Sequence, residues 1–271
     1  MKLENHDKHQ EVMRDVLKYI NTRQPDRFVL KGGAALTICH GFDRTSNDLD
    51  FDGRGGNIIP IIKEICKQRG YKCSVRKDTE TTKRCMIDYG DARTPLKVEV
   101  SYRRQEIPPG ATSKIGGITT YTLDELAEDK ANTYVVRDRI NDVYDLSTIC
   151  SQHADKLSLR VLELARKAVM SRGLDHFEKI VKDQLHETTL DEGALLERFL
   201  EMYEKFELVQ TEIEKKQIEK IKSEYVARKK CPKALLKSKK ESARQVLDGG
   251  RVPNKRTRNT KGLPYLKRGI K

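Results

Sequence analysis

The chain has 271 residues, of which 54 are Lys or Arg and 41 are Asp or Glu, so its formal net charge is +13. Hydrophobic residues make up 37% and charged residues 35%, a balance typical of a water-soluble globular protein with affinity for polyanions. No run of about 18 apolar residues exists and the N-terminus is polar. We therefore expect a cytoplasmic protein with no membrane partner.

The first half of the chain alternates helical and strand patterns. Apolar spacing predicts a helix over 9–23, and the strand-like run FVLKGG (28–33) enters a Gly-Gly turn and a short helix over 34–41. The next predicted elements are a strand at 47–53, a helix at 57–69, and strands at 71–77, 83–90 and 96–103. This order predicts an α+β or mixed α/β fold.

From Thr122 onward the pattern is helical. Thr122 is the expected N-cap, and Glu125 completes a capping box for a helix within 121–139. Further helices are predicted at 141–150, 157–171, 174–184, 191–206 and 207–230. We expect three parts, namely a core domain over 1–121, a helical domain over 122–206, and a charged helix with a basic C-terminal segment over 207–271.

The positive charge is concentrated near the C-terminus. Residues 215–271 hold 20 Lys and Arg against 4 Asp and Glu, a net charge of +16, whereas the remaining residues carry a net charge of −3. The segment 246–271 contains Gly249-Gly250 and two prolines, and we expect it to be extended or disordered until it meets a partner. A cationic segment of this kind favours binding to nucleic acid.

One motif carries most of the chemical information, the stretch LKGGAALTICHGFDRTSNDLDFD at 30–52. Glycines let backbone N–H groups approach phosphate oxygens, and the following helix N-terminus adds a positive dipole end. Asp48 and Asp50 are two apart on a strand, so they project from one face and suit Mg²⁺. Asp52 has the same parity but is expected at the strand end. The alternative is a turn followed by a solvated acidic strand.

This motif resembles that of a known family. K-G-G-x-A-L followed by R-x-S-x-D-L-D-F is similar to the AbiEii/AbiGii-type nucleotidyltransferases, toxins of type IV toxin–antitoxin and abortive-infection systems in the DNA polymerase β-like superfamily. The family pattern K-x6-R-x3-R-D-x-x-D-L is matched from Lys130 through Arg137 to Leu146, except that Asn141 replaces an arginine. Arg139 is a candidate replacement. The resemblance spans roughly 28–150 and implies a nucleotidyltransferase-like mixed β-sheet flanked by helices.

The resemblance implies roles for the residues of the first motif. Gly32 and Gly33 would hold the triphosphate of an NTP. Ser46 would supply a hydroxyl to the phosphates, because Gly33 stands where the superfamily often has serine; the alternative is an ordinary turn serine. Asp48 and Asp50 would be catalytic and would bind Mg²⁺ or Mn²⁺.

A third acidic ligand is expected on a later strand of the sheet. Glu99 in L-K-V-E-V is the natural candidate, and its parity places it on one face with Lys97. Asp88 is a weaker competitor, and an exposed polar strand face is the alternative interpretation.

The second motif supplies further residues. Lys130 would contact a phosphate, with Arg137 one heptad further along the same helix face. Asp142 and Asp145 lie three apart on one helix face and would orient Lys130 or the acceptor hydroxyl. The alternatives are a plain salt-bridged pair on a solvated helix for Lys130 and Arg137, and a helix-surface acidic pair for Asp142 and Asp145.

The implied reaction transfers a nucleoside monophosphate from an NTP to an acceptor hydroxyl, with two metal ions neutralising charge and pyrophosphate leaving. Characterised relatives can use a tRNA 3′ end, so we expect an RNA acceptor and a separately encoded antitoxin partner. Two alternatives remain open. One is a non-catalytic nucleic-acid-binding protein on a degenerate nucleotidyltransferase fold, which Asn141 and the Gly-Gly pair favour mildly. The other is a nucleotidyltransferase with a small-molecule acceptor, which the basic segment disfavours.

Overall fold

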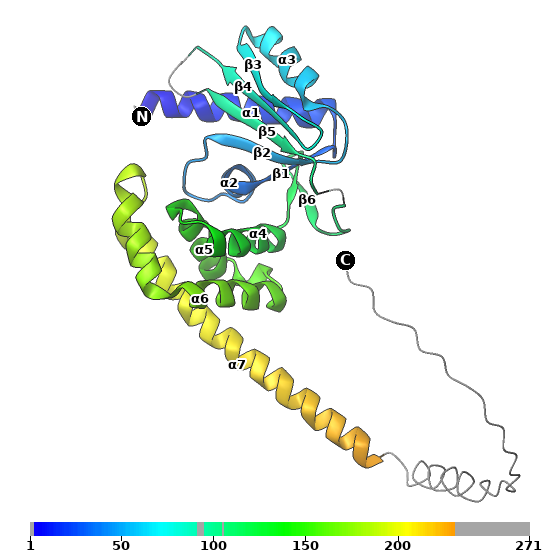
Figure 1. Cartoon of the computed structure of the whole chain (residues 1–271), viewed down its shortest axis with the longest axis vertical. Helices are drawn as coiled ribbons and strands as arrows, with labels where there is room; N and C mark the ends of the chain where they lie inside the picture. The colour runs from blue at the N-terminus through cyan, green and yellow to red at the C-terminus, as the bar shows by residue number, and fades with distance from the viewer. Residues whose placement is uncertain (1–2, 91–94, 105, 231–271) are drawn as a thin grey trace, which may run out of the picture. The chain divides into compact units, whose positions relative to one another are not determined.

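A mixed β-sheet organises the N-terminal half of the chain (Figure 1). The computed structural model describes residues 3–90, 95–104 and 106–230. The strands in these residues are β1 (Phe28–Lys31), β2 (Asp48–Gly53), β3 (Lys72–Asp78), β4 (Thr82–Asp88), β5 (Leu96–Ser101), β6 (Thr112–Ile115) and β7 (Ile118–Tyr121). Within the described ranges they form one seven-stranded sheet in the order β3-β4-β5-β2-β1-β7-β6. β2 runs parallel to β5 and antiparallel to β1.

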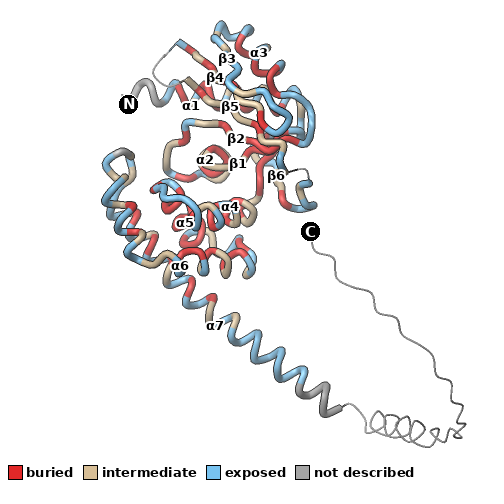
Figure 2. The backbone as a smooth tube through the Cα atoms, in the orientation of Figure 1, coloured by how far each residue is buried: buried red, intermediate tan, exposed pale blue. Residues whose placement is uncertain are grey.

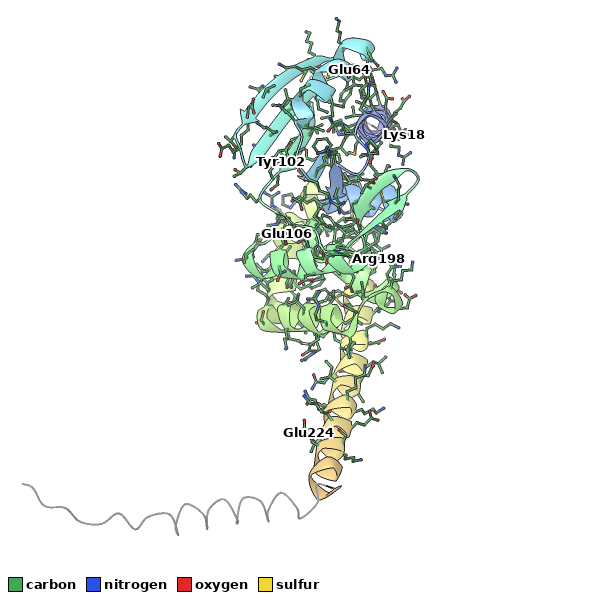
Figure 3. The ribbon with its side chains drawn as sticks, turned by 90° about the vertical axis from the view of Figure 1, so that its right-hand side faces the viewer. Lys18, Glu64, Tyr102, Glu106, Arg198 and Glu224 are labelled. Atoms are coloured by element: carbon green, nitrogen blue, oxygen red, sulfur yellow. The ribbon has the colours of Figure 1, made fainter. Side chains whose placement is uncertain are left out.

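Two helices, α1 (Leu3–Arg23) and α3 (Ile58–Arg69), pack against each other and against the sheet. The apolar positions of α1, such as Val12, Val16 and Ile20, are buried, as their helical spacing predicts. At the start of α3 the side chain of Asn57 accepts a hydrogen bond from the Ile59 amide. The outward-facing side of these helices carries polar residues (Figure 3).

The Gly-Gly turn leads into a short helical segment. It consists of α2 (Gly32–Ala34) followed by a π-helical turn at Ala35–Cys39. The predicted helix at 34–41 is therefore present as the end of a short α-helix followed by a π-helical turn, which is wider than a regular α-helix. Its residues Ala34, Ala35 and Leu36 are buried, so it is held by the core.

The C-terminal half is helical, with α4 (Leu123–Val136), α5 (Ile140–Gln152), α6 (Leu159–Gln184) and α7 (Glu192–Lys230). Thr122 caps α4, because its Oγ1 accepts a hydrogen bond of 3.4 Å from the Glu125 amide. The predicted capping box is not closed, since the Glu125 carboxylate binds Arg104 instead. α6 breaks at Gly173, whose φ of 71° lies outside the helical region, between the two predicted helices.

The hairpin of β6 and β7 is absent from the sequence prediction. Its two-residue turn is Gly116-Gly117, with φ of 56° and 80°, which is the left-handed backbone that such turns require. β7 then pairs parallel with β1, and Leu30 lies opposite Thr120. The hairpin thus extends the sheet beyond β1 and delivers the chain to α4.

The chain divides into two units, the first ending at Ile213 and the second beginning at Glu214. In the first unit α7 buries Leu195, Phe199, Met202 and Phe206 at helical spacing. Every residue from 214 to 224 is exposed (Figure 2). The predicted extended segment 246–271 lies outside the described residues, and the three-domain division stays a prediction.

The predicted fold class is confirmed, since a mixed sheet flanked by helices precedes a helical half. Within the described part of the chain, no helix combines the length and the apolar character needed to cross a membrane.

Candidate active site

Three carboxylates gather on one face of neighbouring strands. β2 and β5 run parallel, and their register places Asp48 opposite Lys97 and Asp50 opposite Glu99. Leu49, between the two aspartates, is fully buried on the other face. The alternation that predicted one acidic and one apolar face of this strand is therefore present, and Glu99 joins the acidic face.

Two cations hold these carboxylates. Lys97 Nζ lies 2.8 Å from Asp48 Oδ2 and 3.4 Å from Asp50 Oδ1, and Arg84 Nε donates to Glu99 Oε2 at 2.5 Å. Burial raises the pKa of Asp50, and Asp48 and Glu99 add to this while Lys97 opposes it. Burial lowers the pKa of Lys97, but its contacts with both aspartates outweigh this and leave the pKa above its ordinary value. The cluster therefore favours additional positive charge.

Asp52 is the next-to-last residue of β2 and lies at the strand end, as predicted. It is 3% exposed, and its carboxylate binds Lys31 Nζ at 2.5 Å and accepts a 2.9 Å hydrogen bond from the Tyr121 hydroxyl. Asp52 thus binds Lys31 and Tyr121, whereas Lys97 binds the other two aspartates. Asp88, the competitor of Glu99, lies at the end of β4, where its Oδ1 accepts a hydrogen bond from the Gly90 amide.

The two glycines of the Gly-Gly turn have different requirements: Gly32 needs a positive φ, and Gly33 a close approach of a side chain. Gly32 has φ of 66°, and a Cβ there would lie 3.8 Å from Asp50 Oδ2. A Cβ on Gly33 would lie 2.5 Å from a guanidinium nitrogen of Arg44, so only glycine leaves room for that side chain. Ser46 is 8% exposed, and its hydroxyl donates a 3.5 Å hydrogen bond to the Asp48 carbonyl. Its predicted phosphate contact stays a prediction.

Lys130 lies in a buried ion-pair network rather than on a solvated helix face. Its Nζ is 2.8 Å from Asp142 Oδ1 and 2.6 Å from Asp145 Oδ2, and all three side chains are at most 9% exposed. Arg44 forms a bidentate pair with Asp145, with distances of 2.5 and 2.7 Å. Arg137 binds Asp142 in the same way, at 2.7 and 3.1 Å. The two aspartates therefore hold the Lys130 ammonium, which is one of the two roles suggested for them, and their part in catalysis stays a prediction.

Arg137 does not continue the helix of Lys130. α4 ends at Val136, and Arg137 has the extended backbone angles φ −146° and ψ 151°. The predicted shared helix face is therefore wrong, but the guanidinium still reaches Asp142. Burial would raise the pKa of Asp142, but Arg137 and then Lys130 outweigh it and lower that pKa. Asn141 and Arg139 are both exposed at the start of α5.

A pocket of about 410 Å³ joins the two motifs. Its described lining residues are Lys31, Gly32, Asp50, Phe51, Arg84, Lys97, Glu99, Ser101, Leu126, Asp129, Lys130, Thr133 and Arg137. Five of these carry positive charge and three carry negative charge, so the lining suits a polyanion that is bound together with a cation. A larger hollow of about 500 Å³ is lined by α1 alone and contains no motif residue.

Four basic residues of this site received no role from sequence reasoning, namely Lys31, Arg44, Arg84 and Lys97. Lys31 and Arg44 belong to the quoted motifs, and Lys97 shares the predicted face of Glu99, so the sequence pattern could have indicated that all three lie at the site. Arg84 carried none, because only the pairing of β4 with β5 places it opposite Glu99.

Comparisons with known proteins identify the family and the fold of this chain. A family model described as the nucleotidyl transferase AbiEii toxin of type IV toxin–antitoxin systems matches residues 16–228. The crystal structure of JHP933 from Helicobacter pylori superposes with a TM-score of 0.64 at 23% identity, covering 82% of this chain and 98% of that one. A candidate nucleotidyltransferase from H. pylori gives 0.62 at 23% identity, covering 78% and 97%.

The two structural likenesses show a shared fold. A comparison with curated proteins found no match. The family model covers well over half of the chain, including the strand of Asp48 and Asp50 and the helices of Lys130 and Asp142. The pocket is lined by residues of both motifs. The chain belongs to the AbiEii family of nucleotidyltransferase toxins and is a nucleotidyltransferase.

Proposed function

We propose that this nucleotidyltransferase moves a nucleoside monophosphate from an NTP to a hydroxyl of a tRNA-like RNA, with Mg²⁺ or Mn²⁺ as cofactor. One observation carries the proposal. The carboxylates of Asp48, Asp50 and Glu99 stand at adjacent register positions, and Asp50 and Glu99 line the same pocket as Lys130 and Arg137. Such a pairing of carboxylates with cations suits a phosphate-bound divalent metal.

The donor set fits a hard divalent cation. Asp48, Asp50 and Glu99 offer carboxylate oxygens, the ligands that Mg²⁺ and Mn²⁺ prefer. In the described residues no group of three or more such side chains is already arranged around one metal position. Lys97 and Arg84 hold the carboxylates instead. When bound, the metal would neutralise charge on the phosphates and on the attacking oxygen.

The remaining residues of the pocket would bind and orient the nucleotide. Lys130 and Arg137 present positive charge to the phosphates, while Asp142 and Asp145 fix Lys130 in place. The backbone at Gly32 lines the pocket beside Asp50 and leaves room for a phosphate oxygen to approach. Phosphoryl chemistry requires mainly this positioning and charge neutralisation.

The basic C-terminal charge supports an RNA acceptor. The net charge of +16 over 215–271 favours a polyanionic acceptor over a small molecule. Most of this segment lies outside the described residues, so the argument for it rests on sequence alone. The family also implies an antitoxin protein that neutralises the enzyme.

A pyrophosphate-release assay tests the proposed reaction. Each of the four NTPs is incubated with the protein and Mg²⁺, alone, with total tRNA, or with aminoglycosides, and EDTA is the metal control. We expect release that requires both metal and tRNA. Pyrophosphate release with aminoglycosides alone would show that the acceptor is a small molecule rather than RNA. The absence of release in every condition would favour a non-catalytic nucleic-acid-binding protein.

Replacing Lys130 by Met is expected to lower the rate of transfer at least tenfold, which corresponds to about 1.4 kcal/mol of transition-state stabilisation. The ammonium is the only group of Lys130 that binds Asp142 and Asp145, and the Met side chain keeps most of the apolar stem. Single-turnover labelling of the acceptor measures the effect, with circular dichroism to verify folding. A variant with the wild-type rate would remove Lys130 from the site.

A further inference from the structure

The ammonium of Lys97 bridges the two aspartates of β2. Its Nζ lies 2.8 Å from Asp48 and 3.4 Å from Asp50. Among the described side chains, no other Lys or Arg forms an ion pair with either aspartate. The parallel register of β2 and β5 fixes the backbone of Lys97 opposite Asp48. Only rotation of its side chain can therefore take the ammonium away from the pair.

A divalent cation on these aspartates would compete with that ammonium. Mg²⁺ binds carboxylate oxygens at about 2.1 Å, so a metal on the oxygens that Lys97 contacts would lie within a few ångströms of Nζ. Two cations at such a distance repel each other strongly in a partly buried site. A metal that binds without nucleotide must therefore displace the Lys97 ammonium from the aspartates, and its net gain in binding free energy is small.

A bound triphosphate changes this balance. Lys97 lines the same pocket as Lys130 and Arg137, so its displaced ammonium would find phosphate oxygens within the pocket. The metal would gain the same phosphates as ligands. Each partner then binds more tightly when the other is present, and thermodynamic linkage makes this coupling reciprocal.

We propose that Lys97 is a tethered counter-ion that occupies the Asp48–Asp50 pair in the metal-free protein and makes metal binding depend on nucleotide. This inference rests on the proposed function, because it assumes that the aspartate pair is a metal site. Lys97 acts here as a positioning residue, and its contribution is separable from the chemistry of transfer.

Direct measurement of Mn²⁺ binding tests the inference. Free Mn²⁺ is followed by electron paramagnetic resonance in the full-length protein, with and without the α,β-methylene analogue of each NTP. In the wild-type protein we expect an analogue to tighten Mn²⁺ binding at least tenfold. In Lys97→Met we expect Mn²⁺ alone to bind at least tenfold more tightly than in wild type, and the effect of the analogue to shrink at least threefold.

Three controls make the result specific. Lys97→Arg keeps a cation at the position and should keep the wild-type coupling. Lys83→Met removes the same charge from a lysine that pairs with Asp78 on the β3–β4 hairpin, and should bind Mn²⁺ as wild type does. Lys97→Gln is the second variant should the Met variant fail to fold by circular dichroism.

The outcomes separate this inference from the proposed function. Wild-type Mn²⁺ affinity and coupling in Lys97→Met and Lys97→Gln would overturn the role of Lys97. If the Asp48→Asn/Asp50→Asn variant loses Mn²⁺ binding in that case, the two aspartates remain the metal site and only the role of Lys97 is rejected. Mn²⁺ binding that is unchanged in the aspartate double variant would overturn the metal site and the counter-ion role together.

Discussion

Asp48→Asn combined with Asp50→Asn is expected to abolish nucleotide transfer, by a factor of at least about a thousand, while the protein stays folded. The side chains of Asp48 and Asp50 are 44% and 36% exposed, and Lys97 is their ion-pair partner. Ion pairs with this much solvent contribute about 0–1 kcal/mol, and removing two like charges relieves their mutual repulsion. Growth inhibition in cells should disappear with the transfer activity.

Two measurements check this prediction together. Acceptor labelling and growth inhibition report activity at matched expression, and a thermal melt reports folding. Asp15→Asn is the matched control, because Asp15 also carries one ion pair, with Arg69, but lies on α1. Undiminished growth inhibition in the double variant would refute the assignment of these aspartates, whereas a large fall in melting temperature would refute the claim that they are dispensable for the fold.

The alternation of apolar and acidic residues in 48–52 predicted the acidic face of β2 because side chains alternate along any strand. The same parity predicted that Lys97 and Glu99 share a face. It could not predict which strand lies beside β2, since β3 and β4 intervene in the chain between β2 and β5. The bridge that Lys97 forms depends on that neighbour relation, so it emerges only from the structure.

Two features of the fold differ from the sequence prediction: the end of α4 and the β6–β7 hairpin. Helical periodicity carried the predicted helix through Arg137, but the chain becomes extended there and the guanidinium folds onto Asp142. The two four-residue strands of the β6–β7 hairpin are too short for periodicity to identify, although Gly116-Gly117 is a turn signal. Arg137 is held by Asp142, which follows it by only five residues, whereas β7 pairs with the distant strand β1.

Arg44 illustrates what spacing alone cannot predict. It lies 101 residues before Asp145, yet the two form a bidentate pair in which the side chains are 5% and 0% exposed. The pair joins the loop before β2 to α5, and Asp145 also holds Lys130. The loop that precedes β2 is thereby tied to α5, whose aspartates also hold the Lys130 ammonium. We expect substitutions of Arg44 or Asp145 to lower both the stability and the activity of the protein.

Replacing Asp145 by Asn is expected to lower the free energy of unfolding by about 3–5 kcal/mol, the usual cost of removing one partner from a buried ion pair. Arg44, whose side chain is 5% exposed, would lose its bidentate partner, and Lys130 would keep only its ion pair with Asp142. The carboxamide has nearly the same volume, so the loss reports charge and hydrogen bonding rather than a cavity.

Denaturant unfolding of Asp145→Asn, Arg44→Met and the double variant measures this effect and assigns it to the pair. Asp145→Asn leaves the buried Arg44 guanidinium without its counter-charge, and Arg44→Met leaves Asp145 paired with Lys130 alone. The two losses should therefore not add, and we expect the double variant to recover about 1–3 kcal/mol of their sum. Asp15→Asn, which breaks an exposed pair with Arg69, should cost less than about 1 kcal/mol. A loss in Asp145→Asn no larger than in Asp15→Asn would mean that the buried network does not stabilise the junction between the loop and α5, and strictly additive losses would mean that Arg44 and Asp145 act independently.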